Sequence, residues 1–65
     1  MNATNAYRKG YAASRASQTG DMDAAESRFI AKYGNDFGDA WMAGWSDYSV
    51  DGVNRVSEWE AENAR

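Results

Sequence analysis

Two stretches of this chain, AYRKGY at residues 6–11 and WMAGWSD at residues 41–47, place a glycine beside large aromatic side chains in a helix-like pattern. A glycine inside a helix costs about 1 kcal/mol relative to alanine, so a compensating contact is expected. If Gly10 and Gly44 lie where two helices cross, they allow the two backbones to approach closely. The sequence therefore predicts a pair of helices that cross at these glycines.

Glycines divide the rest of the chain into short periodic segments, and proline is absent. Helices are expected at about residues 4–17, 22–33, 36–48 and 53–63, and no segment alternates strongly enough to predict a strand. A domain of this size hides only about 60% of the surface of its unfolded chain. The prediction is an all-α fold, a small bundle of three to four short helices in a single domain over residues 1–65.

The expected core is aromatic, because the chain has no leucine and a single isoleucine. An aromatic side chain buries about 150–250 Å², so a few of them suffice for a small core. The clearest amphipathic pattern runs from Phe37 to Tyr48. The predicted structural core comprises Tyr7, Gly10, Tyr11, Phe29, Phe37, Trp41, Gly44, Trp45 and Tyr48.

The chain has neither cysteine nor histidine, which excludes disulfides, the usual zinc ligand sets and catalysis by an imidazole base. Paired carboxylates such as Asp36 with Asp39, or Glu58 with Glu62, are better explained as helix caps and solvated surface. We therefore expect no catalytic residues, no metal site, no cofactor and no small-molecule substrate. No stretch has the apolar character of a signal peptide or a membrane span, so the expected location is the cytoplasm, without membrane contact.

Charge is divided unevenly along the chain, whose formal net charge is −3. Residues 1–20 carry three bases and no acid, whereas residues 21–65 carry ten acids and four bases. The three bases, Arg8, Lys9 and Arg15, can meet the phosphates of a nucleic acid. A solvated polar exterior that keeps a small protein soluble explains the same charges equally well.

Residues 6–13 and 41–47 resemble the ribosome modulation factor family, in which a basic helix with a Gly-Tyr pair precedes a helix with a Trp-x-x-Gly-Trp motif. Members of that family are small helical bacterial proteins that bind the small ribosomal subunit near ribosomal RNA, and related reading frames occur in phages. The resemblance implies that Arg8, Lys9 and Arg15 contact RNA or the ribosome. The acidic net charge of this chain differs from the basic charge of the family.

Two functions from different classes remain open. The first is a non-enzymatic regulator of translation that binds the ribosome or ribosomal RNA. The second is an acidic inhibitor of the phage type, which imitates a nucleic acid and blocks a nucleic-acid-binding enzyme or a defence complex of the host. The candidate partner-binding residues for this second function are Asp36, Asp39, Asp47, Val53, Val56 and Trp59.

Two of these candidate groups have expected positions. The three aspartates, Asp36, Asp39 and Asp47, are expected together on the outward side of the third helix. Trp59 either docks the last helix onto the core or is an exposed anchor for a partner, including a second copy of the chain in a homo-oligomer.

Overall fold

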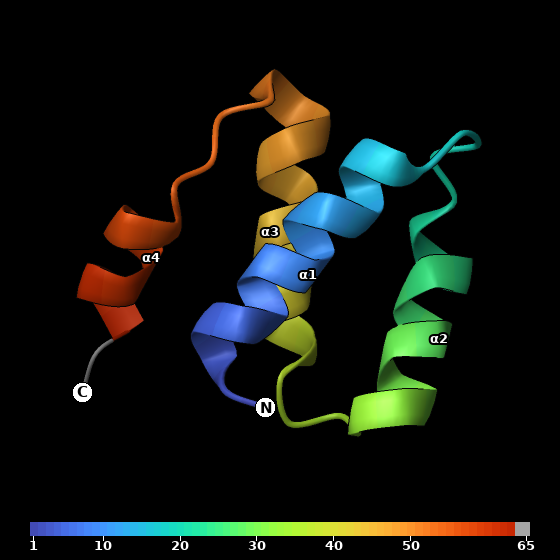
Figure 1. Ribbon diagram of the computed structural model, residues 1–65, viewed down its shortest axis with the longest axis horizontal. Coiled ribbons are helices and arrows are strands. Elements are labelled where there is room, and N and C mark those ends of the chain that lie inside the picture. Colours follow the sequence, from blue (N-terminus) through green and yellow to red (C-terminus); the bar gives the residue numbers. More distant parts are fainter. Residues whose placement is uncertain (64–65) are drawn as a thin grey trace.

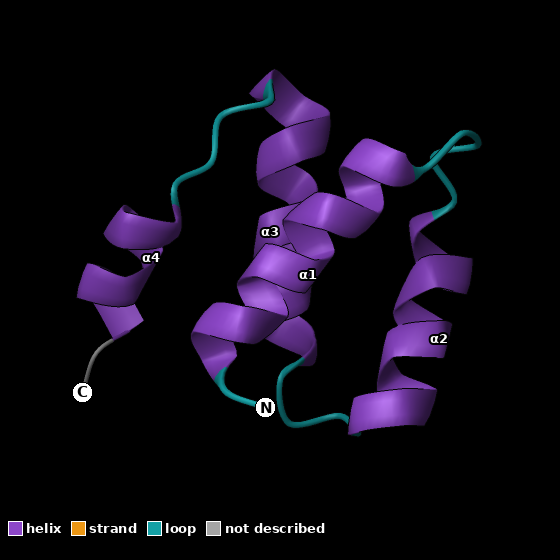
Figure 2. Cartoon of the chain, viewed as in Figure 1, coloured by secondary structure: helices purple, strands orange, loops and turns teal. Residues whose placement is uncertain are grey.

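The computed structural model describes residues 1–63 and contains four helices joined by short connections. They are α1 (Ala3–Ala16), α2 (Met22–Tyr33), α3 (Gly38–Asp51) and α4 (Val56–Asn63), and Figure 2 shows no strand in the described part of the chain. α1 crosses α3, and α2 and α4 lie on opposite sides of this pair (Figure 1). The predicted all-α class is confirmed.

α1 and α3 meet through their backbones at two glycines. A Cβ atom on Gly10 would lie 1.8 Å from the carbonyl oxygen of Trp41. A Cβ atom on Gly44 would lie 1.9 Å from the carbonyl oxygen of Tyr7. Neither distance leaves room for a methyl group, so the close approach requires glycine at both positions. The predicted helix crossing at Gly10 and Gly44 is confirmed.

Aromatic rings pack around this crossing. The rings of Trp41 and Trp45 stack with their centroids 5.3 Å apart, and both side chains are buried. Phe29 of α2 is also buried and stacks on Trp41 at 5.8 Å. The ring of Phe29 therefore attaches α2 to α3 and sets where the outer face of α2 lies.

The nine residues expected in the core divide into two groups by exposure. Six are buried, namely Tyr7, Gly10, Phe29, Trp41, Gly44 and Trp45, and three are half-buried, namely Tyr11, Phe37 and Tyr48. The buried group lies at the crossing or directly against it, whereas the half-buried group lies at its margins.

The first two helices begin where short polar side chains cap them. The Asn2 side chain accepts a hydrogen bond from the Asn5 backbone N–H at 2.8 Å, so α1 begins one residue earlier than expected. The Asp21 carboxylate accepts one from the Ala24 N–H at 3.1 Å, and α2 has its predicted bounds.

The predicted bounds of the third helix, residues 36–48, are wrong at both ends. Before α3, the chain makes a turn in which the Gly38 N–H donates to the Asn35 carbonyl oxygen at 3.1 Å, and no side chain caps the helix. The helix then continues beyond Tyr48. It ends at Gly52, whose φ of 69° is left-handed and whose N–H donates to the Tyr48 carbonyl oxygen at 2.9 Å.

The fourth helix begins at Val56 and not at residue 53 as expected. The backbone N–H of Arg55 donates to the hydroxyl of Tyr7 in α1 at 3.0 Å. The N–H of Val56 donates to the Asn54 side chain at 2.9 Å. The first contact ties the connection at residues 52–55 to α1, the second is local, and α4 begins only after the connection.

Candidate nucleic-acid interface

The three bases of α1 for which the family resemblance implies RNA contact lie on the surface. Arg8, Lys9 and Arg15 are all exposed. Within residues 1–63 both ion pairs are made by Arg55, so neither involves these three side chains. Their charges are therefore directed to solvent and to any anionic partner.

Lys9 meets a second base at an aromatic ring of α2. The Nζ atom of Lys9 and the Nζ atom of Lys32 each lie 5.3 Å from the centre of the Tyr33 ring. Burial alone would raise the pKa of the Tyr33 phenol, but the ammonium groups of Lys9 and Lys32 outweigh burial and lower that pKa below its ordinary value. Two positive charges from different helices thus converge on one phenol.

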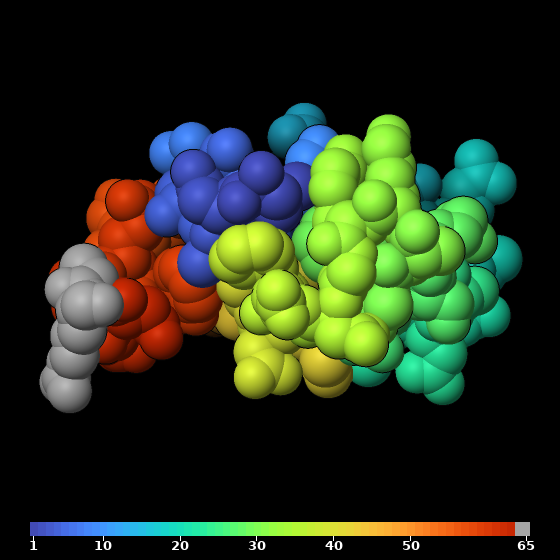
Figure 3. Space-filling view, turned by 90° about the horizontal axis from the view of Figure 1, so that it is seen from below, coloured from blue at the N-terminus to red at the C-terminus, as the bar shows by residue number. Residues whose placement is uncertain are grey.

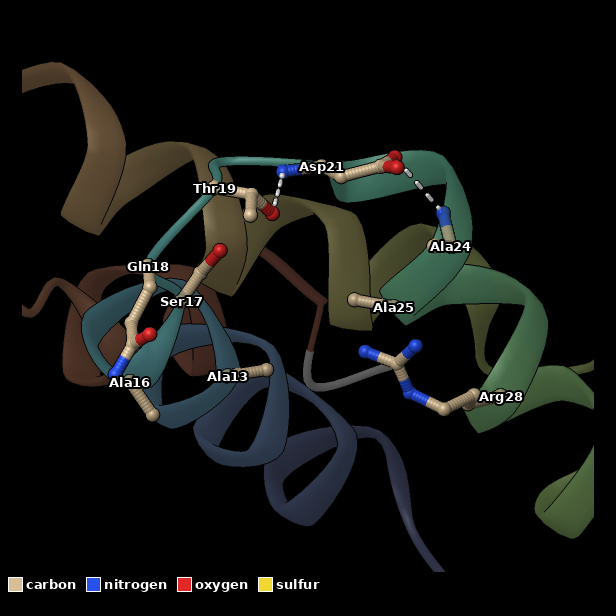
Figure 4. Close-up of a pocket in the computed structure, with 9 residues that line it drawn as sticks. All are labelled: Ala13, Ala16, Ser17, Gln18, Thr19, Asp21, Ala24, Ala25 and Arg28. Carbon is tan, nitrogen blue, oxygen red and sulfur yellow. Dashed lines mark hydrogen bonds between the residues drawn. The ribbon is translucent and has the colours of Figure 1, made fainter.

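A cavity of about 450 Å³ lies farther along the same two helices, between the end of α1 and the start of α2. Figure 4 shows the Arg28 guanidinium extending from α2 toward α1, near the small side chains of Ala13 and Ala25. The Asp21 carboxylate borders this cavity, but it caps α2 through the Ala24 N–H. Among residues 1–63, Arg28 makes no ion pair.

These groups form one surface, which we call the basic α1–α2 surface and define by Lys9, Ala13, Arg28, Lys32 and Tyr33. Lys9 and Ala13 are one turn apart on α1, and Arg28 and Lys32 are one turn apart on α2. α1 and α2 make few direct contacts with one another. The surface is therefore shallow and positively charged, and it lies along the junction of the two helices.

The opposite side of α1 carries a polar network with a structural role. The hydroxyl of Tyr7, a residue with 0% exposure, donates a hydrogen bond to the Asp47 carboxylate and accepts the one from the Arg55 N–H. Burial, followed by the hydrogen bond to Asp47, raises the pKa of Tyr7 to about 12. The expectation that Asp47 lies outward with Asp36 and Asp39 is wrong, because Asp47 is the acceptor for a buried hydroxyl.

Arg55 neutralises the acids at this end of α3. Its guanidinium pairs with the Asp51 carboxylate and lies 3.7 Å from that of Asp47. The hydrogen bonds from Arg55 lower the pKa of Asp51, and the same contact raises the pKa of Arg55. The Tyr11 hydroxyl also donates to the Gly52 carbonyl oxygen at 2.8 Å, so two tyrosines of α1 hold the connection to α4.

The remaining acidic and apolar candidates have mixed exposure. Asp36, Asp39 and Val53 are exposed, and Val56 is half-buried. The ring of Trp59 packs on that of Tyr7, with centroids 5.8 Å apart, and remains half-buried.

Of the two alternatives for Trp59, the structure shows docking of α4 onto α1. The uncovered part of the ring borders cavities of about 230 Å³ and 150 Å³. Figure 3 shows α4 and α2 on opposite sides of the molecule.

Comparison with protein families, curated proteins and solved structures gave a single result. No match was found. Within residues 1–63, no helix combines the length and apolar character needed to cross a membrane. In the same range, no three side chains of His, Cys, Asp or Glu lie together in a group that could hold a metal ion.

Reasoning from the sequence missed Arg28, Lys32 and Tyr33. A signal for them exists, since Arg28 and Lys32 are the only bases in residues 21–54 and are four residues apart. That spacing places both on one side of α2. The sequence alone does not show that this side of α2 meets Lys9 of α1.

Proposed function

We propose that this chain is a small, non-enzymatic, cytoplasmic regulator of translation that binds ribosomal RNA through the basic α1–α2 surface together with Arg8 and Arg15 of α1. The observation that carries the proposal is the separation of charge in the fold. The bases of α1 and α2 make no ion pairs within residues 1–63, whereas Asp47 and Asp51 are paired with Arg55 on the other side of α1. The seven acids from Asp36 to Glu62 repel RNA less where they are neutralised or face away.

Phosphate contacts supply most of the affinity in many nucleic-acid complexes, because each neutralised phosphate releases counterions. The chain offers five bases for such contacts. They are Arg8, Lys9 and Arg15 on α1 and Arg28 and Lys32 on α2. The resemblance of residues 6–13 and 41–47 to the ribosome modulation factor family supports ribosomal RNA as the nucleic acid.

A second function has an observation of its own. Asp36 and Asp39 are exposed beside the start of α3, and Glu58 and Glu62 are exposed on α4. Within residues 1–63 none of these four carboxylates is in an ion pair. An acidic inhibitor would present such carboxylates to a basic nucleic-acid-binding protein.

An affinity pull-down from bacterial lysate, with and without nuclease, tests the proposal with two variants. One replaces Arg8, Lys9 and Arg15 with Gln, and the other replaces Asp36 and Asp39 with Asn. The parent chain should recover ribosomes or ribosomal RNA, the Gln variant should lose them, and the Asn variant should recover as much or more. A nuclease-resistant complex with one basic protein, lost only in the Asn variant, would refute the proposal and support the inhibitor.

The choice of residues keeps loss of binding separate from loss of folding. Asp47 is left unchanged because its carboxylate holds the Tyr7 hydroxyl and the Arg55 guanidinium. All five substituted side chains are exposed, so both variants should melt as the parent does.

A further inference from the structure

Tyr33 is the point at which α1 and α2 bring like charges together. Lys9 of α1 and Lys32 of α2 place their ammonium groups at the same distance, 5.3 Å, from the centre of the Tyr33 ring. Neither lysine is in an ion pair with any of residues 1–63. Two ammonium groups near one ring repel each other, and a bound anion would remove that repulsion.

The Tyr33 ring is held in place by packing on its core side. Phe29 packs on Tyr33 with ring centroids 5.1 Å apart, and Phe29 in turn stacks on Trp41 of the core. The position of the Tyr33 phenol is thus fixed by a chain of aromatic contacts that begins at the helix crossing. The ring is half-buried, and the ammonium groups of Lys9 and Lys32 both act on its phenol group.

We infer that Lys9, Lys32 and the hydroxyl of Tyr33 together form a binding site for a phosphate group. This inference deepens the proposed function, on which it rests for the source of the phosphate, the backbone of ribosomal RNA. The two ammonium groups supply charge, and the phenol supplies one directed O–H donor. The three donors come from two helices, so the site depends on the docking of α2.

Phosphate suits these donors better than a carboxylate does. Lysine is a compact point charge without the planar fork that matches a carboxylate in a bidentate pair. A phosphate has several acceptor oxygens that point in different directions, which allows donors to approach from separate helices. A free phosphate and a phosphodiester share this chemistry, so both are probes of the site.

The first experiment is an NMR titration of the labelled full chain with inorganic phosphate at pH 7, compared with sodium chloride at equal ionic strength. Phosphate should shift the Tyr33 ring signals in a saturable way, and chloride should not. The Lys9→Gln/Lys32→Gln variant should lose this response. The matched Arg8→Gln/Arg15→Gln variant removes the same charge and should keep it. An equal response to chloride, or a response that survives in the Lys9→Gln/Lys32→Gln variant, would overturn the inference.

The second experiment measures binding of a single-stranded RNA oligonucleotide at several salt concentrations. A plot of log K against log salt concentration falls with a negative slope, and loss of one phosphate contact makes that slope less steep by about 0.7 for a single strand. The Lys9→Gln/Lys32→Gln variant, which loses the whole site, should make the slope less steep by about that amount, and each single substitution by a part of it. Tyr33→Phe should weaken binding while the ring stays packed on Phe29.

The two experiments separate the two proposals. RNA binding that is unaffected by all three substitutions, together with no phosphate response, would refute this site and leave the proposed function standing. A phosphate response in a chain that binds neither the oligonucleotide nor ribosomes would refute the proposed function and leave the site standing.

Discussion

Replacing Gly44 with alanine tests the crossing of α1 and α3 with the smallest possible side chain. The added methyl group would lie 1.9 Å from the Tyr7 carbonyl oxygen and 2.8 Å from the Tyr11 backbone nitrogen. Ordinary contacts begin at 3.4 Å, so the two backbones must separate by roughly 1.5 Å, which forfeits much of the dispersion attraction at the crossing. Both neighbours are backbone atoms of a helix, so neither can move aside alone.

The expected loss of stability follows from two opposing effects. Overpacking costs about 1–3 kcal/mol, and the upper end applies here because the obstacle is backbone. Alanine recovers about 1 kcal/mol through its better helix propensity, which leaves a net loss of about 2 kcal/mol. A 65-residue chain has a total stability of only about 3–10 kcal/mol. The Tm should therefore fall by about 8–16 °C.

Gly38→Ala is the matched control in the same helix, because a Cβ atom there would meet nothing within 4 Å. Thermal and urea unfolding followed by circular dichroism should show Gly44→Ala to be clearly less stable than Gly38→Ala. Equal stability of the two variants would refute the backbone contact at Gly44.

Three further expectations concern the aromatic side chains. Tyr7→Phe leaves the Asp47 carboxylate and a backbone N–H without their hydroxyl partner and should cost about 1–3 kcal/mol in urea unfolding; an unchanged midpoint would contradict the network. The pKa of Tyr7 is about 12 in the fold against an ordinary 10.0, so the unfolded chain loses this proton at lower pH than the folded chain. The stability of the parent should therefore fall between about pH 10 and pH 12, and the stability of Tyr7→Phe should fall less over the same range. Trp59→Phe should retain blue-shifted fluorescence, since Trp41 and Trp45 are 2% and 5% exposed; emission typical of solvated tryptophan would show that the core is wrongly assigned.

The helix crossing was predictable because it leaves a local trace. Gly10 and Gly44 each interrupt a helical pattern at a cost, and each is flanked by aromatic side chains that need burial. The bounds of the second helix were predictable from the glycines that divide the chain, because Gly20 and Gly34 flank it. Each of these signals is confined to a few neighbouring residues, so it can be recognised directly in the sequence.

Two of the errors, the start of α4 and the position of Asp47, have a common physical origin in distant hydrogen bonds. The start of α4 is set by a contact between Arg55 and Tyr7, which are 48 residues apart. The position of Asp47 is set by the same tyrosine. Periodicity tells which residues share a face of one helix, but not which face of another helix they meet, and for this reason Lys32 and Tyr33 were missed.

The crossing at Gly10 and Gly44 also bears on how the chain folds. The two glycines are more than thirty residues apart, so the largest packing contact of the molecule is non-local even though every element is a helix. Bringing α1 to α3 requires closure of the intervening segment, and the entropy of that closure grows only slowly with its length. The rate of folding should therefore depend on the encounter of α1 with α3 rather than on the formation of any one helix. Sequence changes on the outer faces of α2 should mainly alter the rate of unfolding, whereas a bulkier residue at Gly44 should slow folding itself.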